Sequence, residues 1–168
     1  MRVGSSHLSY CTNIHPGESW DEIRGNLERY LPRVKRRVSP DAPFGVGLRL
    51  SAAAAQSLCE ADHREDFAAF LRAEDLYVFT INGFPYGAFH GTRVKENVYL
   101  PDWRDGLRLE YTNRLADLLA AWLEPGADGA LLYAEFEGRS KLRVFCDLAG
   151  PALRRPARLS PLQADTLL

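Results

Sequence analysis

Residues 76–82 (LYVFTIN) form an apolar run as long as a β-strand. Its β-branched and aromatic residues are typical of a buried strand, and the run stops at the polar Asn82. The residues that follow include Gly83, Pro85 and Gly87, which break regular structure, and polar side chains continue among them. In parallel α/β proteins, functional groups collect where strands end and the next loops begin. We therefore expect the end of this strand to border the functional site.

Strands and helices alternate along the first part of the chain. Two further strands are expected, at residues 7–12 and 44–50. Helices are expected after Ser19, Ser51 and Asp105, because each of these side chains can accept a hydrogen bond from the first turn of a helix. Three strand-helix units in series predict a parallel sheet wrapped by helices.

The predicted fold class is α/β, a partial (β/α)8 TIM barrel with the first three strand-helix units and a divergent C-terminal tail. A complete barrel of this kind takes about 250 residues, and the chain has 168. Residues 1–128 are expected to form the N-terminal part of the barrel. Residues 129–168 form the tail. Within it, the pattern of residues 131–136 and 142–146 predicts an antiparallel hairpin. The remaining residues of the tail are expected to be loosely ordered.

Composition narrows the class of protein. The net charge of −1 and the 46% of hydrophobic residues fit a soluble globular protein, with no nucleic-acid partner. Arg33, Lys35, Arg36 and Arg37 form a basic cluster, which we expect on the solvated face of a helix. The sequence shows neither an apolar run of about 20 residues nor a signal peptide, so we expect a cytoplasmic protein without membrane insertion. Three widely spaced cysteines predict reduced thiols.

Three stretches of sequence carry a resemblance to a known family: residues 7–18, 45–51 and 80–87, the last followed by residues 89–91 and 94–95. On these stretches, residues 1 to about 128 resemble EboE-type metabolite traffic proteins, a group within the xylose-isomerase-like TIM barrels. The resemblance implies a protein like the metal-dependent sugar-phosphate isomerases and epimerases, tied to the preparation of a metabolite for transport.

The resemblance also implies that the Glu, Asp and His metal ligands come largely from later strands of a full barrel. A divalent metal is therefore a possible cofactor whose site is expected to be incomplete in this chain. Residues 129–168 match nothing that should follow in the family, so we expect that a truncation or a frameshift produced this tail.

Histidines and aromatic residues near the strand ends are candidates for catalysis and metal binding. Tyr86 and His90 lie in the loop after residues 76–82 and are the candidates for moving a proton. His15 follows the first strand, and its neutral imidazole could bind a divalent metal or a sugar hydroxyl. The alternatives are that the aromatic side chains fix the loop to the rim of the sheet and that His15 caps its own loop.

Polar residues at the same strand ends are candidates for binding the substrate. Arg49 is a charge at the end of an apolar strand, so it must meet an anion, which is either a substrate phosphate or carboxylate or a neighbouring Glu or Asp. Asn82 can donate to and accept from a sugar hydroxyl, although Asn also caps turns, and Asn13 is expected to shape the same pocket. Phe84 could stack on a sugar ring, and Lys95 could hold a phosphate or stay solvated.

Two functions fit these residues. The first is an enzyme in which a divalent metal polarises a carbonyl or hydroxyl while a side chain moves a proton at the adjacent carbon. The second is a binding or carrier protein that holds a small polar metabolite without turnover. A third possibility is an inactive fragment, because an open arc of strands has an unpaired edge and predicts self-association.

Overall fold

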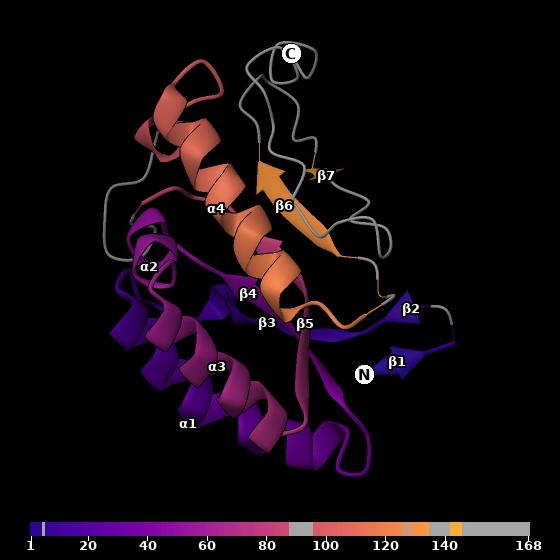
Figure 1. The fold of residues 1–168 in the computed structure, drawn as a ribbon. Coiled ribbons are helices and arrows are strands. Elements are labelled where there is room, and N and C mark those ends of the chain that lie inside the picture. The colour runs from indigo at the N-terminus through magenta and orange to yellow at the C-terminus, as the bar shows by residue number, and fades with distance from the viewer. Residues whose placement is uncertain (5, 88–95, 126, 128, 135–141, 146–168) are drawn as a thin grey trace.

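The chain folds around one sheet, drawn in Figure 1 from a computed structural model that describes residues 1–4, 6–87, 96–125, 127, 129–134 and 142–145. The elements, in chain order, are β1 (Arg2–Val3), β2 (Ser6–His7), β3 (Ser9–Cys11), the 3₁₀ turn η1 (Thr12–Ile14), α1 (Trp20–Val38), β4 (Phe44–Arg49), α2 (Ala52–Ser57), α3 (Ala61–Ala73), β5 (Leu76–Asn82), the 3₁₀ turn η2 (Glu96–Tyr99), α4 (Gly106–Trp122), β6 (Ala130–Ala134) and β7 (Leu142–Phe145).

The sheet has five strands in the order β3-β4-β5-β6-β7, while β1 and β2 form a separate antiparallel pair. Strands β3 to β6 are parallel, and β7 runs antiparallel to β6. The β6–β7 pair confirms the predicted hairpin. However, β6 also pairs with β5, so the sheet has one parallel strand more than predicted. The sequence of β6 could not show this, because the pattern of a strand does not identify its neighbour.

Side-chain caps fix where α1, α2 and α4 begin, as predicted. Ser19 and Glu22 form a capping box at the start of α1, in which each side chain bonds to the backbone of the other. The Glu22 carboxylate accepts hydrogen bonds from two backbone N–H groups, which lowers its pKa. Ser51 caps α2 by accepting from the N–H of Ala54, and Asp105 caps α4.

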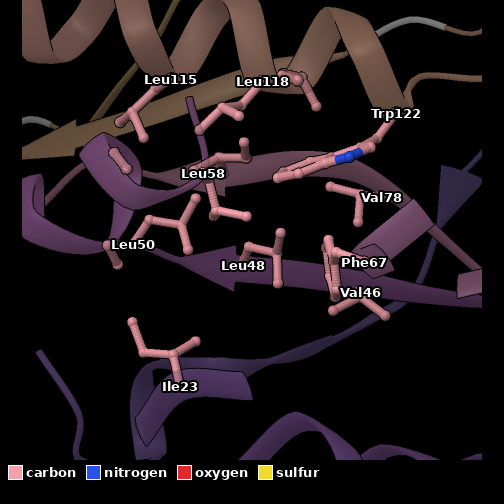
Figure 2. Packing of buried hydrophobic residues seen from close by; sticks show 14 of the residues in the cluster. Ile23, Val46, Leu48, Leu50, Leu58, Phe67, Val78, Leu115, Leu118 and Trp122 are labelled. Carbon is pink, nitrogen blue, oxygen red and sulfur yellow. The ribbon is translucent and has the colours of Figure 1, made fainter. Parts of the chain in front are cut away.

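The core lies between the helices and one face of the sheet. Val46 of β4 belongs to it, together with apolar residues of all four α-helices. Phe67 of α3 lies at its centre, where Trp20 and Trp122 meet its ring edge-on at centroid distances of 5.2 and 5.0 Å. Figure 2 shows Phe67 beside Val46 and close to Trp122. None of the helices in the described part of the chain is long and apolar enough to span a bilayer.

The opposite face of the sheet is covered closely at its amino end by the N-terminal segment. A Cβ atom on Gly45 would lie 2.8 Å from the Leu8 carbonyl oxygen and 3.0 Å from the Phe79 ring. Only glycine fits at that distance. On the same face, the Tyr77 hydroxyl and His7 Nδ1 are 2.9 Å apart.

The basic cluster on α1 is solvated in part. Arg33, Arg36 and Arg37 are exposed, as expected. Lys35 is buried, contrary to the prediction, with its ammonium 3.1 Å from the Asp75 carboxylate. Lys35 is buried because it lies four residues after the buried Leu31 and therefore on the same face of α1, which packs against the core.

The parallel strands lie in the order in which they occur in the chain, and the helices contribute to one core on one face of the sheet. A doubly wound sheet would reverse its strand order at a switch point. The fold is therefore mixed α/β, and it is compatible with an arc of a (β/α)8 barrel. That this arc is part of a (β/α)8 barrel stays a prediction.

Candidate functional site

The carboxyl ends of β3, β4 and β5 lie at one edge of the sheet, which we call the carboxyl edge. The register places Arg49 of β4 directly beside Asn82 of β5. The end of β3 joins them through Thr12, whose hydroxyl accepts a hydrogen bond of 2.8 Å from the Arg49 backbone N–H. Asn13 follows in the same turn and is half-buried. Three of the predicted substrate-binding residues, Asn13, Arg49 and Asn82, therefore lie at this edge.

Arg49 is the central charge of the carboxyl edge, with 5% of its surface exposed. Its Nη1 donates to the Gly17 carbonyl at 2.7 Å, and its Nη2 donates to the Gly87 carbonyl at 2.8 Å. The same two atoms face the Glu18 carboxylate, at 3.1 and 3.4 Å. Arg49 thus meets a neighbouring Glu, which is one of the two anions that the sequence left open. Its role toward a substrate stays a prediction.

Glu18 was not singled out from the sequence. Its backbone is held on both sides, because its N–H donates to Glu22 Oε2 at 3.0 Å and its carbonyl accepts from the Ser51 hydroxyl. Its side chain is 34% exposed. The sequence predicted a Glu or Asp as one possible partner of Arg49, but which carboxylate it is depends on the register of β3 and β4.

His15 lies beside the same edge, with its ring fixed by two tyrosines. Its Nε2 is 2.9 Å from the Tyr10 hydroxyl, and its ring stacks on Tyr30 with a centroid distance of 4.3 Å. Burial lowers the pKa of His15 because it disfavours the imidazolium form. Within the described ranges, no group of three His, Cys, Asp or Glu side chains is placed to hold a metal ion. His15 as a metal ligand stays a prediction.

A small pocket opens between the β3–α1 loop and α1. Its cavity volume is about 10 Å³, and the rest of the hollow is open to solvent. Polar lining comes from Thr12, His15, Asn26 and Arg49. That volume is room for about one water molecule, so a larger polar group needs a neighbouring side chain to move aside.

The segment after β5 holds Asn82, Phe84 and Tyr86 through local contacts. Asn82 Oδ1 accepts from the backbone N–H of Phe84 at 3.0 Å, which is the turn-capping alternative. The Phe84 ring lies 5.4 Å from that of Tyr99. Tyr86 is half-buried and meets the Tyr111 ring edge-on at 5.1 Å. His90 and Lys95 lie outside the described residues.

A second buried arginine, Arg108, lies behind this segment and was missed in the sequence. Its Nε donates to the Pro101 carbonyl at 2.8 Å, and its Nη1 donates to the Gly83 carbonyl at 3.1 Å. Its guanidinium also lies 5.6 Å from the ring centres of both Tyr86 and Tyr111. Arg108 occurs in an ordinary helical sequence, so no local signal marked it.

Tyr111 anchors α4 to the end of β4. It is fully buried, and its hydroxyl donates to the Leu50 carbonyl. Burial raises the pKa of Tyr111 because it disfavours the phenolate. The hydroxyl therefore remains a donor at every ordinary pH.

Comparisons with protein-family models, with curated proteins and with solved structures find no match to this chain.

Proposed function

We propose that this protein binds a small polar metabolite with an anionic group at the carboxyl edge. The observation that carries this proposal is Arg49, a buried guanidinium at the end of a parallel strand and on the wall of a small pocket. Arg is suited to carboxylates and phosphates because its planar fork makes two parallel hydrogen bonds. Asn82, beside it in the sheet, offers an amide for a neighbouring hydroxyl.

The more specific form of the proposal comes from the resemblance to EboE-type metabolite traffic proteins. In that form the metabolite is a sugar phosphate, and the protein isomerises or epimerises it with a divalent metal, using Tyr86 and His90 to move a proton. The described residues do not assemble the metal ligands. We therefore assign no step to a metal, and binding of the metabolite by Arg49 is proposed independently of one.

The second candidate is a carrier that holds the metabolite without turnover. The contacts of Tyr86 favour it, because the ring packs against both Tyr111 and Arg108, as expected for a support of the loop. Self-association through the free edge of β3, which ends the sheet, also stays a prediction.

The experiment is isothermal titration of the full chain with a panel of sugar phosphates, each also assayed for isomerisation with and without Mn²⁺. We expect a sugar phosphate to bind, and we expect Arg49→Lys to weaken its binding at least tenfold because the fork is lost. Arg114→Lys, at a half-buried arginine of α4 that pairs with Glu110, is the matched control and should bind normally. Absence of binding by every sugar phosphate, or equal binding by Arg49→Lys, would contradict the proposal. Product formation separates the enzyme from the carrier.

A further inference from the structure

The contacts of the Arg49 guanidinium are of two kinds. Two backbone carbonyls, of Gly17 and Gly87, accept short hydrogen bonds of 2.7 and 2.8 Å. These groups are neutral, so they position the guanidinium without cancelling its charge. The negative charge comes from Glu18, at longer distances of 3.1 and 3.4 Å. Position and charge compensation are thus supplied by different groups.

The Glu18 side chain can leave this position without unfolding the loop. Its backbone is held independently of the side chain, by hydrogen bonds to Glu22 and Ser51. The side chain is 34% exposed, so water can solvate its carboxylate after rotation. Ion pairs between an arginine and a carboxylate in good geometry are closer, at about 2.7–2.9 Å.

We propose that Glu18 is an exchangeable internal anion on Arg49, and that a phosphate group, free or carried by a small metabolite, displaces it. This inference rests on the proposed function, because it concerns the same arginine. A buried guanidinium without an anion is costly, so departure of Glu18 requires a replacement. A phosphate presents two oxygens to the fork in the same way as the carboxylate does.

The pocket beside Arg49 offers the incoming group a further donor. Thr12 is 95% buried, since 5% of its surface is exposed, and it lines the pocket. Its oxygen accepts from the Arg49 backbone N–H, which leaves the hydroxyl hydrogen to donate to an anion. The carboxylate of Glu18 competes with the phosphate. The apparent affinity is therefore reduced by the fraction of molecules in which Arg49 is accessible.

The test is isothermal titration of the full chain with inorganic phosphate at constant ionic strength. Glu18→Gln keeps an acceptor of the same size beside Arg49 but removes the competing charge. We expect it to bind phosphate at least tenfold more tightly than the unchanged chain. Asp21→Asn, which removes an exposed charge from the first turn of α1, is the matched control and should match the unchanged chain within twofold.

Equal phosphate affinity of Glu18→Gln and the unchanged chain would overturn the inference. So would tight binding that survives Arg49→Lys in the Glu18→Gln background. Circular dichroism establishes that each variant folds. If Glu18→Gln does not fold, Glu18→Asp replaces it, because the shorter carboxylate reaches Arg49 less well and should also strengthen phosphate binding; no gain there would overturn the inference.

The inference and the proposed function fail in different ways. If Glu18→Gln binds inorganic phosphate through Arg49 but no sugar phosphate binds to either form, the proposed function fails and the inference stands. If a sugar phosphate binds through Arg49 equally well with and without the Glu18 charge, the proposed function stands and the inference fails.

Discussion

Two arginines, Arg49 and Arg108, are equally buried, with 5% of their surface exposed, but they are held differently. Arg49 has a partly exposed carboxylate, that of Glu18, as its charged partner. Arg108 donates to the carbonyls of Pro101 and Gly83 and lies over two tyrosine rings. A side-chain carboxylate can be exchanged for another anion, whereas backbone carbonyls and packed rings cannot. We therefore expect ligand binding at Arg49 and a packing role for Arg108.

The largest effect on stability is expected at Arg108. Arg108→Ala removes, among other contacts, the hydrogen bonds to Pro101 and Gly83 and the contacts with the rings of Tyr86 and Tyr111. We therefore expect the free energy of unfolding to fall by about 2–4 kcal/mol. Urea denaturation followed by circular dichroism measures this. Arg104→Ala, at an exposed arginine that pairs with Asp102, should stay within about 0.5 kcal/mol. If Arg108→Ala lowers the free energy of unfolding no more than Arg104→Ala does, the packing role of Arg108 is contradicted.

A smaller loss is expected at Arg49. Arg49→Met leaves Glu18 unpaired, but that carboxylate is partly exposed and can be solvated. We expect the free energy of unfolding to fall by about 1–3 kcal/mol, below the range for breaking a fully buried pair. The same variant should lose ligand binding, while Arg108→Ala should keep it where it folds. If Arg49→Met retains full ligand binding, the assignment of ligand binding to Arg49 rather than to Arg108 is wrong.

A still smaller loss of stability is expected at Tyr111, whose ring contacts Arg108 and whose hydroxyl contacts the end of β4. Tyr111→Phe removes the hydroxyl that donates to the Leu50 carbonyl, just beyond Arg49, and should lower the free energy of unfolding by about 1 kcal/mol. Tyr86→Phe, at the neighbouring half-buried ring, is the control and should change it by less than about 0.5 kcal/mol. If the two variants behave alike, the Tyr111 hydroxyl does not anchor α4.

The smallest effect concerns pH. Burial lowers the pKa of His15 below its ordinary value of 6.5, so the unfolded chain binds its proton more readily than the folded chain. The contribution of His15 to stability is therefore fully present above pH 6.5 and is lost as the pH falls below it toward the folded pKa. An NMR titration of the His15 ring should give a midpoint below 6.5. A midpoint above 6.5 would show that a nearby anion, rather than burial, dominates.

Local features were predictable from the sequence. Ser19, Ser51 and Asp105 were expected to cap helices and do so, because a cap depends on residues within one turn. The end of β5 was expected at Asn82, because the apolar run stops there and Gly83 and Pro85 follow.

Features that depend on distant residues were not predictable. Glu18 and Arg49 are 31 residues apart, and their pairing follows from the register of β3 and β4. The burial of Arg108 depends on the carbonyl of Gly83, 25 residues away. The parallel pairing of β6 with β5 depends on the path of α4, which the sequence of neither strand contains.

The most direct test of ligand binding at Arg49 is an assigned ¹H–¹⁵N spectrum of the full chain, recorded while ribose 5-phosphate is added as the probe. We predict that the signals of Thr12, Arg49 and Asn82 shift together in a saturable manner, while those of Arg104 and Arg108 stay in place. Shifts confined to the Arg108 region, or no saturable shift at the carboxyl edge, would contradict the assignment of the binding site to Arg49.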